Sequence, residues 1–267
     1  NNIIIISIFF KIILLFLIIL YFIFFNKIKK SKSNQNNKYE EDHIKKMRES
    51  SAECTLFLNK NDEFPIDEPC NVLLIGSGAR NTIKGGLGSG DVESRYYTTC
   101  EEGLEKAGFK ITSKEWLKQY PILKEEKIHE SINYFSKLYK TYKGNLFSII
   151  AFPEYNLNIS LNEEEKNADI AIYVLARNSG EGTDRRLIKG DIMLTDTEIK
   201  DILFLNKNYK KFMLVLNVGG VVDLSPVKEV SNILLLPFFI NQVLDIIENL
   251  HSKRRKPNPF NIFLFYY

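Results

Sequence analysis

The sequence predicts an α/β domain with a doubly wound, mostly parallel sheet flanked by helices, preceded by a hydrophobic helix of the membrane-spanning type. Three observations lead to this prediction. Several short apolar runs end in glycine or in polar loops, as buried parallel strands do. Segments with helical character separate these runs, and such alternation is typical of a parallel sheet built from βαβ units. The chain also begins with a long stretch of Ile, Leu, Phe and Tyr.

The amino-terminal segment predicts membrane anchoring. From Ile3 to Phe25 almost every residue is apolar, and only Lys11 carries a charge. The length of this run matches the roughly 20 residues with which a helix spans a bilayer. The lysines that follow it favour a cytoplasmic location for that side. We therefore expect a single-pass membrane protein, with residues 1–26 as the transmembrane-type segment and residues 27–38 as a polar linker.

Another interpretation stays open for both ends of the chain. The Asn, Ile, Phe and Lys vocabulary of residues 1–30 also fits translated AT-rich sequence, and residues 253–267 contain no recognisable element. Under that interpretation, the folded part at residues 39–252 would be secreted or cytoplasmic instead of membrane-anchored.

The folded part alternates between predicted strands and predicted helices. Strands are predicted at residues 71–76, 109–112, 168–176, 212–217 and 232–236. Helices are predicted at residues 98–108, 114–142 and 195–205, and residues 40–58 suit a helix that leads into a short strand. Thr98 or Thr99 can cap the first of these helices and Gly108 can end it. Pro121 predicts a break in the second helix, because proline has no backbone N–H to donate.

Composition and charge argue against several classes of function. The 36 Lys and Arg residues exceed the 33 Asp and Glu residues by only +3, which is too little to favour nucleic acid as a partner. The three cysteines and three histidines lack the spacing of a zinc site. We therefore expect no nucleic acid, no metal and no cofactor.

The first candidate loop follows the strand at residues 71–76 and is rich in glycine. Reactive loops of doubly wound sheets gather at the carboxyl ends of the strands. This loop begins Gly-x-Gly, but Asn81 occupies the third glycine position of a dinucleotide fingerprint, which argues against a nucleotide site. Its polar residues could hydrogen-bond a polyhydroxylated ligand; they are Arg80, Lys84, Ser89 and Asp91. The alternative is a tight surface loop that caps the sheet.

The second candidate loop places Glu181 between two glycines, directly beyond a buried strand. A carboxylic acid at such a position can serve as a general acid/base if its environment tunes its pKa. Arg177, Asp184 and Arg185 could bind hydroxyl groups or hold the loop through charge-assisted hydrogen bonds. The alternative is a solvated loop carboxylate. The third loop, at residues 217–225, contains a glycine pair and is expected to be a structural turn.

Three segments around these loops are informative because of their sequences and their order along the chain. They are Gly-Gly-Leu-Gly-Ser-Gly-Asp-Val at residues 85–92, the strand and loop from Ala-Asp-Ile-Ala to Gly-Glu-Gly-Thr-Asp-Arg at 168–185, and Val-Leu-Asn-Val-Gly-Gly-Val-Val-Asp-Leu-Ser at 215–225. Together they resemble the second domain, an α/β sandwich, of glycoside hydrolase family 3, the β-glucosidases and related exo-acting enzymes. The resemblance covers residues 39–236. Residues 52–60 also resemble the lead-in of members whose sandwich precedes the barrel.

The resemblance implies a retaining β-glucosidase-like hydrolase that acts on a β-glucoside or oligosaccharide and needs no cofactor. An Asp on a barrel domain would attack the anomeric carbon, and Glu181 would be the general acid/base, with the two carboxyl groups about 5–5.5 Å apart. This sequence contains no segment that resembles the barrel domain. The barrel is therefore expected as a partner, either in cis or in trans. Leu87 departs from the family pattern, which usually has a small polar residue there. The alternative is a non-catalytic carbohydrate-binding or truncated remnant of such an enzyme.

Overall fold

A computed structural model describes residues 38–51, 54–66, 68–86, 97–142, 153–180 and 184–236, together with residues 17, 20 and 21. The chain divides into two compact units, Asn1–Met47 and Arg48–Tyr267. In the described part of the chain, no helix is both long and apolar enough to cross a membrane. The predicted membrane segment from Ile3 to Phe25 lies outside the described residues, apart from residues 17, 20 and 21.

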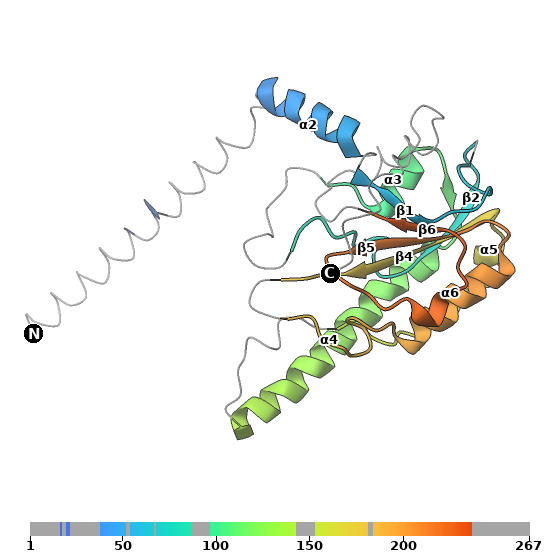
Figure 1. The fold of residues 1–267 in the computed structure, drawn as a ribbon. Coiled ribbons are helices and arrows are strands. Elements are labelled where there is room, and N and C mark those ends of the chain that lie inside the picture. The colour runs from blue at the N-terminus through green and yellow to red at the C-terminus, as the bar shows by residue number, and fades with distance from the viewer. Residues whose placement is uncertain are drawn as a thin grey trace, which may run out of the picture. The chain divides into compact units, whose positions relative to one another are not determined.

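A six-stranded sheet forms the centre of the second unit (Figure 1). The strands are β1 (Leu56–Asn59), β2 (Asn71–Ile75), β3 (Lys110–Ile111), β4 (Ile170–Arg177), β5 (Phe212–Val218) and β6 (Ile233–Leu235). Their order across the sheet is β1-β6-β5-β4-β2-β3. Every pairing is parallel except that of β1 with β6. The five predicted strands are all present, and the short strand expected within residues 40–58 is β1.

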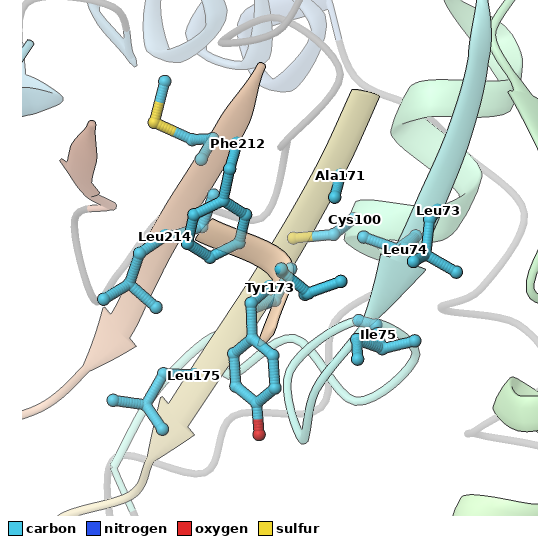
Figure 2. Close-up of a cluster of buried hydrophobic side chains, with 14 of the residues drawn as sticks. Leu73, Leu74, Ile75, Cys100, Ala171, Tyr173, Leu175, Phe212 and Leu214 are labelled. Atoms are coloured by element: carbon cyan, nitrogen blue, oxygen red, sulfur yellow. The ribbon is translucent and has the colours of Figure 1, made fainter. Parts of the chain in front are cut away.

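The central strands are apolar because both faces of the sheet are covered. Seven of the eight positions of β4 are buried, as are four of the five positions of β2. Figure 2 shows how their side chains pack against those of β5; the labelled residues are Leu73, Leu74, Ile75, Cys100, Ala171, Tyr173, Leu175, Phe212 and Leu214. Burial of each leucine, isoleucine or phenylalanine side chain among them stabilises the fold by about 1.5–3 kcal/mol.

Helices connect the strands, and three of them begin with a capping box. The helices are α2 (Lys38–Ser51), α3 (Cys100–Lys106), α4 (Lys114–Tyr142), α5 (Glu163–Lys166) and α6 (Asp196–Asn208), with a 3₁₀ turn, η3, at Ser225–Val227. The capping side chains belong to Thr99, Asn162 and Thr195. Each accepts a hydrogen bond from the backbone N–H three residues later and so satisfies a donor at the helix start. Gly108 adopts a φ of +91° just after α3, as expected for a helix-ending glycine.

The break predicted at Pro121 is wrong, because α4 continues through this residue. Proline removes the N–H that would bond the carbonyl four residues earlier, which here belongs to Leu117. The side chain of Arg80 supplies the missing donor, with its Nη1 atom 2.9 Å from the Leu117 oxygen. A distant part of the chain therefore satisfies the carbonyl that the proline leaves free.

The helices cover both faces of the sheet. Figure 1 shows α3 above the sheet and α4 and α6 below it. The chain passes from β2 through α3 to β3 at one edge, and then returns through α4 to β4 and onward to β5 and β6. Its direction across the sheet thus reverses between β2 and β4. This is the doubly wound architecture that the sequence predicted.

Candidate functional site

The three candidate loops lie together at the carboxyl-terminal edge of the sheet. They follow β2, β4 and β5, and β4 pairs in parallel with both of the other strands. Open α/β sheets bind ligands outside the carboxyl ends of the strands, at the point where the strand order reverses. Here that point lies between β2 and β4, so the first and second loops flank it.

Gly76 fixes the start of the first loop against β4. Its φ is +106°, a conformation that other residues rarely adopt. A Cβ atom at this position would lie 2.4 Å from the carbonyl oxygen of Val174. Two residues on, the N–H of Gly78 donates to that same oxygen at 2.9 Å, and the hydroxyl of Ser77 accepts from the N–H of Ala176. The first loop is therefore closely attached to the strand that leads to Glu181.

Arg80 anchors the first loop to the helices. Its Nη2 and Nε atoms donate to the two carboxylate oxygens of Glu101 on α3, and Nη1 bonds the Leu117 carbonyl on α4. The hydrogen bond from Arg80 is the largest influence on Glu101, and with Lys114 it lowers the pKa of this carboxyl despite its burial. Three guanidinium nitrogens are thus engaged within the protein, and these contacts favour a structural role for Arg80.

Asn217 ties the first loop to the end of β5. Its side-chain Oδ1 accepts from the N–H of Ile83, and its Nδ2 donates to the carbonyl of the same residue at 3.1 Å. The side chain is buried, so these two bonds are shielded from water. Lys84 comes next in the chain, and its Nζ lies 5.9 Å from the centre of the Tyr97 ring. The binding role of Lys84 stays a prediction, as do those of Ser89 and Asp91, which lie outside the described residues.

The backbone N–H groups at the start of α3 are not free to bind a nucleotide phosphate. Its first backbone N–H groups already donate to protein oxygens: Cys100 to the Thr82 hydroxyl, Glu101 to the Ala79 carbonyl and Glu102 to the Thr99 hydroxyl. A phosphate-binding helix needs such groups free. Across the residues that the structure describes, no cluster of three or more His, Cys, Asp or Glu side chains could hold a metal ion.

Arg177, at the end of β4, points into the protein. Its side chain is only 4% exposed, and its Nη2 lies 2.6 Å from a carboxylate oxygen of Glu198 on α6. Its Nε and Nη1 donate to the backbone carbonyls of Asp191 and Ala176. Of the two roles considered for this residue, these contacts support holding the loop. Substrate binding by Arg177 stays a prediction that no contact supports.

The far side of the second loop is fastened through Asp191. Its two carboxylate oxygens accept hydrogen bonds from the side chains of Arg185 and Arg186 and from the backbone N–H of Arg186. Burial alone would raise the pKa of Asp191, but these hydrogen bonds lower it below its ordinary value. Asp184 is exposed to solvent, and Glu181 lies outside the described residues. The roles of both carboxylates therefore stay predictions.

Two large apolar side chains lie exposed on the neighbouring loops. Leu187, beyond β4, is 73% exposed, and Val221, beyond β5, is 76% exposed. The two loops run side by side, because the N–H of Asp223 donates to the carbonyl of Ile192. Both residues thus present apolar surface to solvent near the carboxyl-terminal edge of the sheet.

Sequence reasoning missed Asn217, Glu198 and Asp191. Asn217 follows five apolar residues at the end of a predicted strand, and a polar side chain at that position could have indicated a residue that holds a loop. Glu198 was visible as the acidic residue of the Thr-Asp-Thr-Glu helix start, but its pairing with Arg177 joins positions 21 residues apart. Nothing in the sequence around Asp191 predicts that it collects two arginines.

Comparisons with known proteins show which family the chain resembles. Residues 54–240 match the glycosyl hydrolase family 3 C-terminal domain. The chain is 30% identical to β-glucosidase A of Butyrivibrio fibrisolvens over 220 residues, covering 72% of this chain and 25% of that protein. For a β-glucosidase of Ruminococcus albus the identity is 27%, over 71% of this chain and 19% of the relative.

A solved structure extends the likeness to three dimensions. The structure of β-glucosidase 3B from Thermotoga neapolitana, in complex with glycerol, superimposes with a TM-score of 0.62 at 30% sequence identity. The match covers 84% of this chain and 30% of the Thermotoga chain. This chain thus spans between 19% and 30% of the length of these relatives. Since the family match covers most of its residues, the chain belongs to glycosyl hydrolase family 3 and carries that family's C-terminal domain.

Proposed function

We propose that this domain contributes the general acid/base, Glu181, to a retaining β-glucosidase whose nucleophile comes from a barrel domain. Glu181 would protonate the departing sugar oxygen and then activate the water that releases the glucosyl group. Lys84, Ser89, Asp91 and Asp184 would bind hydroxyl groups of the substrate.

The main support is the way in which both flanks of the Glu181 segment are fastened. On one side, the Ser179 hydroxyl donates to the Gly219 carbonyl at 2.9 Å, and Arg177 is locked in its buried ion pair. On the other side, Arg185 is paired with Asp191. A general acid must be held within hydrogen-bond reach of the oxygen that it protonates. Fixed flanks at the switch point of the sheet suit that requirement.

The exposed apolar residues support a covering domain at this edge. Leu187 and Val221 flank the loops that would face the substrate. A barrel domain seated on this edge would remove them from water, which stabilises the contact by about 25 cal/mol per Å² of apolar surface buried. The same contact would bring the nucleophile toward Glu181.

A hybrid enzyme tests the proposal. Residues 54–240 replace the matching domain of the Thermotoga neapolitana β-glucosidase, and Glu181→Gln is compared with Asp184→Asn, a carboxylate change in the same loop. We expect Glu181→Gln to slow hydrolysis of alkyl glucosides by about 10²–10⁴-fold. Hydrolysis of dinitrophenyl glucosides should slow much less in its first step, because that leaving group needs no proton. Azide should partly restore turnover in Glu181→Ala by replacing the activated water.

Two outcomes would contradict the assignment. One is an equal loss on alkyl and dinitrophenyl glucosides. The other is a loss for Asp184→Asn that depends on the leaving group as strongly as that for Glu181→Gln. A folded hybrid without activity on any glucoside would instead favour a carbohydrate-binding domain that does not catalyse.

A further inference from the structure

A polar cleft of about 390 Å³ lies at the edge of the sheet opposite the candidate loops. Its lining comes from the turn after β1, the end of α6, the connection from α6 into the first residue of β5, and the residues just before β6. The residues are Asn61, Glu63, Asn206, Lys207, Tyr209, Lys210, Phe212, Ser231 and Asn232. Because α6 has 13 residues, its two ends are roughly 20 Å apart along the helix axis, which separates this cleft from the carboxyl-terminal edge.

Several residues that line the cleft are hydrogen-bonded to one another, and we call this group the floor. The N–H of Asn61 donates to the side chain of Asn232 at 2.9 Å, and the amide of Asn232 donates in turn to the Phe212 carbonyl. Asn61 and Glu63 are linked by two further hydrogen bonds, each 3.0 Å long. Asn232 is only 2% exposed. The shape of the floor is therefore set before any ligand arrives, which lowers the entropy lost on binding.

The rim carries hydrogen-bonding groups that are still available. Within the described part of the chain, four lining side chains have no hydrogen-bond or ion-pair partner: Asn206, Lys207, Lys210 and Ser231. They offer ammonium donors, a hydroxyl and an amide that both donates and accepts. Glu63 adds a carboxylate oxygen as an acceptor. The lining thus offers both donors and acceptors to a ligand.

The charges at this end of the sheet nearly cancel, which leaves little net attraction for an anion. The cleft lies at the carboxyl end of α6, where the helix dipole places partial negative charge. Together with Glu63, this partial charge opposes the attraction of the two lysines for an anion. A sugar fits better, since each of its hydroxyl groups both donates and accepts a hydrogen bond. The volume is at the lower end of the roughly 300–1,000 Å³ of small-molecule sites, which suits a mono- or disaccharide.

We propose that this cleft is an accessory binding site for a neutral sugar, on the opposite edge of the sheet from the candidate loops. It goes beyond the proposed function, because the two sites share no residue. Hydrolysis through Glu181 can fail while the cleft still binds sugar, and the reverse is equally possible.

NMR titration of the isotope-labelled 267-residue chain with glucose and with cellobiose tests the site. We expect saturable shifts of the amide signals of Asn61, Ser231 and Asn232, with a dissociation constant in the millimolar range. Asn206→Ala combined with Ser231→Ala should weaken binding about tenfold through the loss of two hydrogen bonds. Asn208→Ala is the matched control, because this exposed residue of the same helix end does not line the cleft, and it should leave binding unchanged.

Three results would each overturn the proposal. The first is the absence of any saturable shift up to about 100 mM sugar. The second is a set of shifts confined to the loops after β2, β4 and β5, which would assign the binding to the carboxyl-terminal edge. The third is an equal or stronger response of the cleft signals to inorganic phosphate, which would make it an anion site.

Discussion

Replacing Arg177 with Met tests whether the residue before the Glu181 loop is a structural anchor. Met fills much of the space of the arginine stem but removes the charge. Glu198, 5% exposed at its side chain, would then remain as a buried carboxylate without its cation, and one of its oxygens already has no hydrogen-bond partner in the described structure. Breaking one side of a buried ion pair costs about 3–5 kcal/mol. We therefore expect the free energy of unfolding to fall by about that amount.

Urea unfolding followed by the fluorescence of Trp116, the one tryptophan of the chain, measures this loss. Adding Glu198→Gln to Arg177→Met should restore part of the stability, since it removes the unpaired charge but keeps an oxygen to cap α6. Lys118→Met, which removes an exposed ion pair on α4, is the control and should change stability by less than about 1 kcal/mol. If Arg177→Met costs no more than this control, the buried-anchor interpretation is wrong.

Two further predictions concern α6 and the end of β5. Burial raises the pKa of Asp201 from 3.8 to about 6, so the folded state holds this proton more tightly than the unfolded state, and stability is lost as the pH rises from about 4 through 6. Asp201→Asn should therefore raise the free energy of unfolding at pH 8 by about 1–2 kcal/mol, below the 3 kcal/mol limit of about two pKa units, and have no such effect at pH 3. Urea unfolding at both pH values measures this, with the exposed Asp196→Asn as control. Equal gains in stability at pH 3 and pH 8 would disprove the prediction. Asn217→Ala should lower the free energy of unfolding by about 2 kcal/mol through the loss of its two hydrogen bonds to Ile83, and it should speed hydrogen exchange at the Ile83 amide. If that amide exchanges no faster than in the control Asn208→Ala, Asn217 does not hold the first loop.

The sheet could be predicted because its signal is local. The apolar runs around β2, β4 and β5 bury almost every position, and a strand covered on both faces has no polar alternation to obscure its limits. The starts of α3 and α6 could be predicted in the same way. In each, a threonine and a glutamate three residues later accept hydrogen bonds from each other's backbone N–H groups, so the signal lies within one turn.

The contacts that shape the site could not be predicted, because they join distant positions. Arg177 follows a strand, and the sequence alone leaves open whether such a side chain meets solvent or protein; its partner Glu198 on α6 decides the matter. Arg80 was expected to meet a ligand, yet its guanidinium is held by α3 and α4. Polar residues beside glycines look the same in sequence whether they contact a ligand or support the loop that does.

Pro121 gives α4 a property that an uninterrupted helix of this length would lack. The proline leaves the Leu117 carbonyl of α4 without a backbone donor, and the side chain of Arg80 donates to it. A backbone amide at position 121 would compete for the same oxygen. Replacing Pro121 by a residue with a backbone N–H would therefore weaken the bond from Arg80 and, with it, the attachment of the glycine-rich first loop to α4.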